Sequence, residues 1–285
     1  MARTPAKSNL SKKSRKMPRH PRRDLDLEGS DPRIVTTLAR GLRVLRAFHA
    51  HDEQPLGNKE LAERTGLAKA TVSRLTYTLT QLGFLSQDAR SGAYALAAGV
   101  LAPAYTFLSR LDIRRVARPY MQKLAIQPGV TVSLATRHEL RMTAIESVVA
   151  ESVVPHAGLF GGRAPIARTA IGHAYLAGLK PDAREQLMAE LRDHYAGDWA
   201  TIGPRIQRDI RTIERKGYCV VLGEWTPSIS GVAVPIVVDD DGLVLSMSAG
   251  GPAKLLSADL LEELGIMLRD VRRELERAVG RPIRE

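Results

Sequence analysis

Apolar positions in the first hundred residues recur first with the spacing of helices and then with that of short strands. Recurrence every three or four residues predicts three helices, over residues 34–50, 59–65 and 69–82. Asn58 is expected to cap the second helix, and Gly83 is expected to end the third. Two short segments with strand character, 84–86 and 93–96, flank a polar loop that contains Gly92. Three helices followed by a hairpin predict a small domain over residues 31–96.

The rest of the chain alternates blocks of strand pattern with blocks of helix pattern. After helices at 97–110 and 113–126, the strand-like segments are 130–136, 141–148, 218–222, 232–238 and 243–248. Helical patterns occupy 165–178, 182–195 and 204–216, and a last helix has one apolar face formed by Leu260, Leu264, Met267, Leu268, Val271 and Leu275. This order predicts an α+β domain with a mainly antiparallel sheet over residues 112–285, joined to the first domain by a linker helix at 97–111.

The elements of residues 31–96 follow the order of a winged helix-turn-helix, in which the third helix reads DNA. One face of that helix holds Val72, Leu75, Leu79 and Leu82, which are expected to point into the core. A polar opposite face by itself is more typical of a solvated helix, but the order of three helices, the tight turn at 66–67 and the hairpin favour DNA binding. The residues predicted to contact DNA are Lys69, Ala70, Thr71, Ser73, Arg74 and Tyr77 on the helix and Arg90 at the hairpin tip.

Positive charge is concentrated at the N-terminus. The net charge is +11, and residues 1–23 hold nine Lys or Arg and no Asp or Glu, whereas charges nearly balance in the rest of the chain. Three prolines and few apolar residues predict that residues 1–30 form a disordered basic tail. Two interpretations remain open: a solvated tail, or an arm that binds DNA phosphates without sequence preference.

The sequence lacks the patterns of common enzymes and metal sites. Cys219 is the single cysteine, so no intramolecular disulfide or cysteine-rich zinc site is expected, and its predicted strand favours a buried apolar role. The acidic run 239–241 precedes Gly242 and favours a turn over a metal site. The glycine-rich stretches 158–162 and 250–251 match no phosphate-binding loop. Without a predicted transmembrane helix or secretory signal, we expect a cytoplasmic protein with no cofactor and no metal.

Several short segments are informative through their joint order and spacing. They are residues 38–45, 60–75 and 82–85 in the first domain, and residues 117–119, 161–165, 216–218, 233–235 and 245–248 in the second. In this arrangement, over residues 34–280, the chain resembles the IclR family of bacterial transcriptional regulators. The resemblance implies a GAF-like effector domain, a homodimer or a dimer of dimers, and a small organic acid or related catabolite as effector.

The resemblance also implies an effector pocket. The matching positions are the loop Gly161-Gly162 with the adjoining Arg163, and two serines, Ser246 and Ser248, on one side of a predicted strand. A pocket Asp of some members falls on Val221 and a pocket Cys on Gly231, so both polar groups are missing here. This difference favours an aromatic or longer acid over a two- or three-carbon acid. The serines also suit a solvated strand face, and Arg163 either pairs with a ligand carboxylate or points to solvent.

We therefore expect a sequence-specific transcriptional regulator whose operator binding responds to a small-molecule effector, an organic or aromatic acid of a catabolic pathway. Its expected partners are a double-stranded DNA operator, the effector and further copies of the chain, as a homodimer or tetramer, with no membrane. One alternative is an architectural DNA-binding protein without a ligand, which would need no second domain of about 170 residues. Another alternative is an enzyme with a fused DNA-binding domain. The sequence contains none of the common catalytic motifs, which argues against it.

Overall fold

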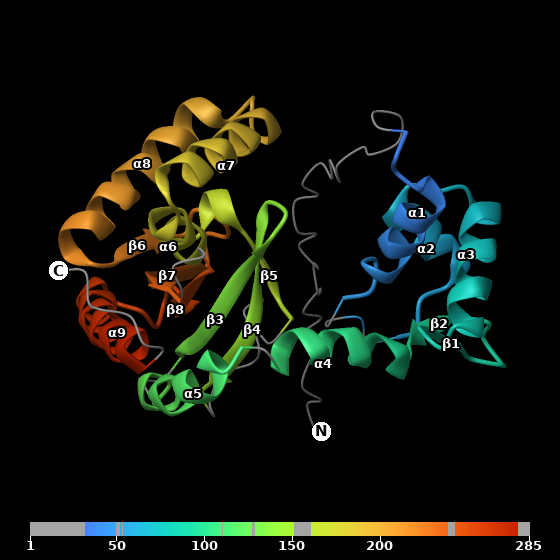
Figure 1. Ribbon diagram of the computed structural model, residues 1–285, viewed down its shortest axis with the longest axis horizontal. Helices are drawn as coiled ribbons and strands as arrows, with labels where there is room; N and C mark the ends of the chain where they lie inside the picture. The colour runs from blue at the N-terminus through green and yellow to red at the C-terminus, as the bar shows by residue number, and fades with distance from the viewer. Residues whose placement is uncertain are drawn as a thin grey trace, which may run out of the picture. The chain divides into compact units, whose positions relative to one another are not determined.

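The computed structural model describes residues 32–49, 52, 54–109, 111–126, 129–150, 161–238 and 243–278. The predicted basic tail 1–30, residues 158–160 and the acidic run 239–241 lie outside the described residues. The described elements form a helical unit with a two-stranded hairpin and a unit built on a six-stranded sheet (Figure 1).

The helical unit follows the predicted order of three helices and a hairpin. Its elements are α1 (Thr36–Leu45), α2 (Asn58–Thr65), α3 (Lys69–Gln81), β1 (Leu85–Gln87) and β2 (Tyr94–Leu96). The two strands pair antiparallel. Its core is formed by Val44, Ala47, Leu56, Leu61, Ala62, Val72, Leu75, Leu85 and Tyr94.

Helix α1 ends at Leu45 and not at the predicted residue 50, and two further predictions within this unit are wrong. Asn58 is the first residue of α2 rather than its cap, because the extended Gly57 precedes the helix and no side chain caps it. Leu82 does not reach the core: α3 ends at Gln81, and the side chain of Leu82 is 63% exposed. Gly83 turns the chain there with a φ of 73°. Thr76 is fully buried instead, and its hydroxyl donates to the Val72 carbonyl one turn earlier at 3.0 Å.

The segment predicted as one helix over 97–110 consists of a 3₁₀ turn, Ala98–Val100, followed by α4 (Leu101–Ser109). The turn lies against the end of α3, where the amide of Gly99 donates to the Gly83 carbonyl at 3.0 Å. A Cβ at Gly99 would lie 2.5 Å from that oxygen, so only glycine permits this approach. Helix α4 has no buried residue.

The second unit contains one six-stranded antiparallel sheet flanked by helices. Its elements are α5 (Ile113–Leu124), β3 (Thr131–His138), β4 (Arg141–Val149), β5 (Arg163–Pro165), α6 (Ala170–Gly178), α7 (Pro181–His194), α8 (Trp199–Lys216), β6 (Cys219–Leu222), β7 (Ile229–Val237), β8 (Val244–Pro252) and α9 (Ala258–Ala278). The strand order is β5-β4-β3-β8-β7-β6, and each neighbouring pair is antiparallel. The predicted α+β class with an antiparallel sheet is confirmed.

Two helix boundaries differ from those predicted. The helix predicted from residue 165 begins only at Ala170, because Arg163–Pro165 form the edge strand β5 and a 3₁₀ turn covers Ile166–Arg168. The extended Thr169 sets that start, since its hydroxyl accepts from the Gly172 amide at 3.3 Å. Helix α8 begins at Trp199, before the predicted residue 204, and includes Pro204 near its start, where proline removes a single helical hydrogen bond.

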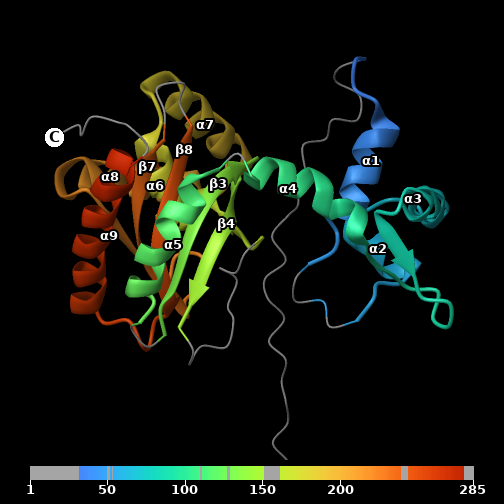
Figure 2. The same cartoon turned by 60° about the horizontal axis from the view of Figure 1, so that its bottom comes forward.

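The two faces of the sheet differ in the size of their side chains. One face packs against α5 and α9 and carries large residues such as Val132, Leu134, Leu245 and Met247. The other face lies beneath α6, α7 and α8, as Figures 1 and 2 show together. Because strand residues alternate between faces, this second face receives the small residues between the large ones. The difference determines where the second unit has free space.

Candidate functional site

The outer face of α3 is the first candidate surface. Of the residues predicted to contact DNA, Lys69, Ala70, Ser73, Arg74 and Tyr77 are exposed and Thr71 is half-buried. The core face of the same helix holds the predicted Val72 and Leu75, while the predicted Leu82 lies beyond its end. The exposed residues therefore lie along one side of a helix that the core holds in place.

The start of α3 is tied to α2. The side-chain amide of Asn58 donates to the Ser73 hydroxyl at 2.9 Å and to the Lys69 carbonyl at 3.3 Å. The intervening turn begins at Gly66, whose φ of 72° is the left-handed conformation that glycine adopts without strain. Together these features fix the N-terminal end of α3, the part of such a helix that approaches base edges in helix-turn-helix proteins.

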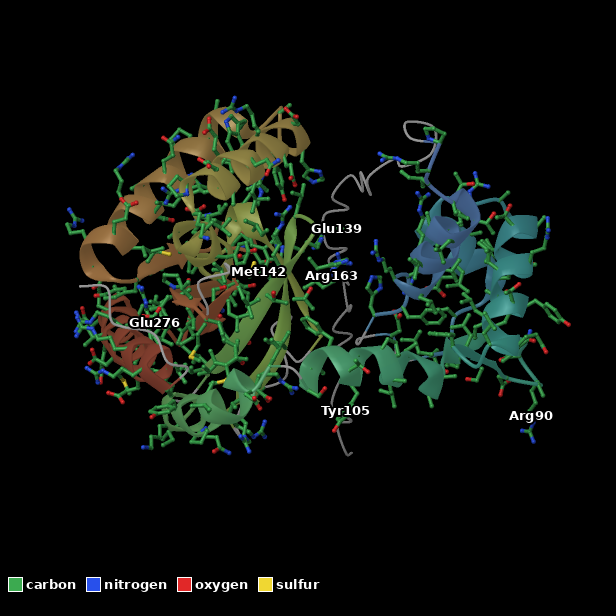
Figure 3. All side chains as sticks on the ribbon, in the orientation of Figure 1. Arg90, Tyr105, Glu139, Met142, Arg163 and Glu276 are labelled. Atoms are coloured by element: carbon green, nitrogen blue, oxygen red, sulfur yellow. The ribbon has the colours of Figure 1, made fainter. Side chains whose placement is uncertain are left out.

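The hairpin tip is ordered by one carboxylate. Oδ1 of Asp88 accepts from the amides of Ser91 and Arg90, at 2.7 and 3.1 Å, and from the Ser91 hydroxyl at 2.8 Å. These hydrogen bonds, led by that from the Ser91 amide, hold the pKa of Asp88 below its ordinary value. Arg90 projects from the tip, away from the helices of its own unit (Figure 3).

The second candidate site is a cavity of about 140 Å³ on the small-residue face of the sheet. All six strands of the sheet contribute to its wall, together with the 3₁₀ turn before α6, the start of α6 and the turn between β6 and β7. Its lining residues are Thr131, Ser133, Ala135, Met142, Ala144, Gly162, Ala164, Arg168, Thr169, Ala170, Ile171, Val221, Glu224, Trp225, Ile229, Ser230, Gly231, Ser248, Ala249, Gly250 and Gly251.

The cavity exists because the strands carry small side chains where the helices do not reach them. At the sheet centre these are Ser133 and Ala135 on β3, Ser248 on β8 and Gly231 on β7. The neighbouring positions that face α5 and α9 are filled by valine, leucine and methionine. The wall is mostly carbon, with hydroxyl groups placed at intervals, which is the composition of a small-molecule site.

Four of the predicted effector residues line this cavity: Gly162, Val221, Gly231 and Ser248. Ser246 is not among the lining residues. It is fully buried beneath α6, and its hydroxyl donates to the Ile171 carbonyl at 2.8 Å. Gly161 lies outside the lining as well, and its amide donates to the Ala144 carbonyl at 2.8 Å.

Arg163 also lies outside the cavity lining. It is on β5, where its guanidinium is 3.4 Å from the Glu139 carboxylate and 3.3 Å from Nδ1 of His138, at the turn between β3 and β4. Burial lowers the pKa of the Arg163 guanidinium, and the nearby Arg141 charge acts in the same direction. Figure 3 shows Arg163 and Glu139 close together, and Met142, a lining residue, further along the sheet.

The charged residues of the cavity were missed from the sequence. They are Arg168, in the 3₁₀ turn before α6, and Glu224, in the turn after β6. The Glu224 carboxylate lies 3.7 Å from Arg205 and 3.8 Å from Arg208, both on α8. Neither residue belongs to a periodic pattern, and Arg168 fell within a segment interpreted as helix, so no sequence signal marked them.

The described residues show neither a metal-binding cluster nor a membrane-spanning helix. No group of three His, Cys, Asp or Glu in the described part of the chain is placed to hold a metal ion. Across those residues, no helix has the length and apolar character needed to cross a bilayer. Cys219 is buried, and burial raises the pKa of its thiol well above the ordinary value, which favours the neutral form.

A helix-turn-helix unit and a cavity-bearing α+β unit in one chain define a ligand-responsive transcriptional regulator. A family model described as "IclR helix-turn-helix domain" matches residues 37–89. Another, described as "Bacterial transcriptional regulator IclR C-terminal", matches residues 105–277. The chain belongs to the IclR family of bacterial transcriptional regulators, which confirms the resemblance seen in the sequence. It is a DNA-binding regulator with an effector-binding domain.

Similar proteins agree with this assignment over most of the chain. The HTH-type transcriptional regulator TsaQ1/TsaQ2 of Comamonas testosteroni is 34% identical over 259 residues, covering 88% of this chain and 92% of the relative. The crystal structure of an IclR family transcriptional regulator from Brucella abortus is 40% identical, with a TM-score of 0.73, and covers 88% of this chain and 95% of that one.

A third structure contains a ligand. It is an IclR homologue from Microbacterium hydrocarbonoxydans, complexed with 4-hydroxybenzoate. It is 22% identical to this chain, with a TM-score of 0.65, and covers 85% of this chain and 98% of that one. At this identity the likeness shows the fold.

Proposed function

We propose that the cavity binds a single-ring aromatic acid, or an organic acid of similar size, and that its occupancy changes operator binding. The observation that carries this proposal is the volume and lining of the cavity. Its volume of about 140 Å³ is close to the roughly 150 Å³ of an apolar cavity that accommodates benzene. An acid of two or three carbons would leave much of that space empty and lose the contacts that stabilise a bound ligand.

The chemistry of the wall supports the same ligand class. Val221 has a hydrocarbon side chain and Gly231 has none, while Ser133, Ser248 and Thr169 carry hydroxyl groups. Carbon surface favours a ring, and separated hydroxyl groups suit polar substituents on its edge. The Microbacterium homologue, solved with 4-hydroxybenzoate, gives a specific compound with which to begin.

On the DNA side, we propose that α3 enters the major groove and that Arg90 on the hairpin contacts the backbone. The proposed contacts from α3 are those of Lys69, Ala70, Thr71, Ser73, Arg74 and Tyr77. Arg74 would read a guanine through two parallel hydrogen bonds, while Lys69 would bind phosphate. The exposed, fixed N-terminal end of α3 supports this assignment.

We propose a homodimer, or a pair of dimers, assembled through apolar helices. Helix α4 buries no residue and exposes Leu101 at 63%, Tyr105 at 73% and Phe107 at 49%. A helix this apolar gains stability when a second copy covers it. Twofold symmetry would place two α3 helices on two half-sites of a palindrome-like operator. We further propose that the protein is not an enzyme and that it acts in the cytoplasm, where bacterial DNA lies.

The test uses the full-length protein and an operator selected from a random DNA pool. We expect 4-hydroxybenzoate to raise the Tm and to change operator affinity, and we expect acetate at the same concentration to do neither. Ser248→Ala should weaken 4-hydroxybenzoate binding about threefold to tenfold, the worth of one hydrogen bond. Ser246→Ala is the matched control, and its ligand affinity should stay unchanged because Ser246 does not line the cavity. Equal responses to both acids would contradict the proposed ligand class.

A further inference from the structure

The two charged residues that line the cavity differ in how fully they are paired. Glu224 faces two guanidinium groups, from Arg205 and Arg208. Arg168 has one carboxylate partner, Asp198, at 2.5 Å. The side chain of Asp198 is 65% exposed, whereas that of Arg168 is 22% exposed. Arg168 therefore has fewer charged partners than Glu224, and its one carboxylate partner is largely exposed.

The guanidinium of Arg168 uses only part of its hydrogen-bonding capacity. Nη2 donates to Asp198, and the guanidinium carbon lies 5.6 Å from the centre of the Tyr195 ring. Nε is buried and has no hydrogen-bond partner within the described structure. In arginine, the Nε–H and one Nη–H point the same way and form a fork that fits the two oxygens of a carboxylate. Asp198 occupies one prong of this fork.

We infer that Arg168 is the charged anchor of the effector, and that Asp198 occupies its place when no ligand is bound. This inference rests on the proposed function, in which the ligand is an aromatic acid. The ligand carboxylate would take both prongs of the fork and so satisfy the buried Nε that Asp198 leaves unpaired. Asp198 would return to water, which costs little because its side chain is already largely solvated.

The replacement of Asp198 by the ligand carboxylate also affects a region outside the cavity, because Asp198 directly precedes α8. The Asp198 amide donates to the Tyr195 carbonyl at 2.8 Å, and its carbonyl accepts from the amides of Thr201 and Ile202 at 3.0 and 3.1 Å. These backbone bonds keep the turn between α7 and α8 intact when the side chain moves. Ligand binding at Arg168 therefore breaks the side-chain bond between this turn and the segment before α6 without unfolding either helix.

The experiment is calorimetry on the full-length protein with two probes, 4-hydroxybenzoate and its neutral analogue 4-hydroxybenzamide. The wild type should bind the acid at least tenfold more tightly than the amide. Arg168→Gln should weaken acid binding about 10- to 100-fold, the effect of losing a hydrogen bond to a charged group, with little change for the amide. Asp198→Asn should strengthen acid binding about twofold to fivefold, because it removes the competitor.

The control is Glu214→Gln. Glu214 pairs with Arg184 at 3.6 Å, also between α7 and α8, with side chains 57% and 27% exposed, and neither residue lines the cavity. Acid affinity should not change in this variant. Since misfolding would not strengthen binding, Asp198→Asn keeps the inference testable if Arg168→Gln fails to fold.

Several outcomes would overturn the inference. Arg168 is not the anchor if the Arg168→Gln protein still prefers the acid. The same conclusion follows if the Asp198→Asn protein binds the acid more weakly. If the wild type binds both probes equally, Arg168 is not a charged anchor, but the proposal that the cavity binds a single-ring aromatic ligand is not contradicted. A wild type that binds neither probe overturns the anchor and the proposed function together.

Discussion

Filling the cavity with a side chain should imitate the effector and exclude it. Ala144 on β4 lines the cavity and is 7% exposed. Ala144→Leu adds three carbon atoms, half the number in a benzene ring. Because a cavity of roughly 150 Å³ admits a whole benzene molecule, a cavity of about 140 Å³ has room for them.

The size of the effect follows from the buried carbon. Three carbons at about 0.8 kcal/mol each stabilise the folded state by about 2.4 kcal/mol. Ordering a leucine side chain costs about 0.5–1 kcal/mol, so the net gain is about 1.5 kcal/mol. For a domain of this size, this corresponds to a rise in Tm of about 3–6 °C. A site that is already full would instead be destabilised by about 1–3 kcal/mol through overpacking.

Thermal and urea unfolding with and without 4-hydroxybenzoate measure both effects. At a concentration of a hundred times its Kd, the ligand should stabilise the wild type by about 2.7 kcal/mol, and Ala144→Leu should lose this increment. Thr143→Leu is the matched control, since it adds carbon at the adjacent residue, which does not line the cavity. If Ala144→Leu keeps the full ligand increment, the ligand binds elsewhere and the reasoning fails.

Four further predictions concern other parts of the chain. Arg74→Ala should weaken operator binding by about 1–3 kcal/mol and relax base preference at one position per half-site in a binding-site selection; unchanged affinity would remove it from the reading surface. Deleting residues 1–23 should flatten the salt dependence of non-specific DNA binding at unchanged sequence preference, and an unaltered slope would mean an inert tail. Leu101→Glu should shift sedimentation toward monomer, while a wild type that is already monomeric at micromolar concentration would refute the dimer. The Tyr218 hydroxyl donates to Glu262 at 2.6 Å, and burial, followed by this bond, raises the pKa of Tyr218 to about 12. Its stabilisation is therefore complete below pH 10 and is lost as the pH rises toward 12; Tyr218→Phe should lack that alkaline loss of unfolding free energy, and matching pH profiles would contradict this.

The DNA-binding unit was largely predictable because its architecture depends on local patterns. Val72 and Leu75 repeat at helical spacing, and glycines mark the turn before α3 and its end. Leu82 has the same helical spacing as Val72 and Leu75, but helical spacing does not show where the helix ends. The left-handed Gly83 ends α3 one residue earlier, and tertiary contacts give the buried position to Thr76.

The cavity was predictable only in part, since its wall is assembled from distant segments. The resemblance led to Gly162, Val221, Gly231 and Ser248, which line it. The same reasoning grouped Ser246 with Ser248, because both face one side of β8. Which of two serines meets the cavity depends on where α6 crosses the strand, and the Ile171 carbonyl covers Ser246. Such a crossing point is a property of packing, which strand periodicity does not encode.

The order of the strands determines when, during synthesis, the cavity of this protein can form. Neighbouring central strands β3 and β8 are far apart in sequence: Thr131 pairs with Gly250. A chain emerging from the ribosome has a complete DNA-reading unit long before β8 is made, and contacts of such separation form late. The cavity wall, which runs from Thr131 to Gly251, then closes in the last stage of folding. If the cavity is the effector site, as proposed, effector binding distinguishes finished molecules from truncated ones that retain the helix-turn-helix unit.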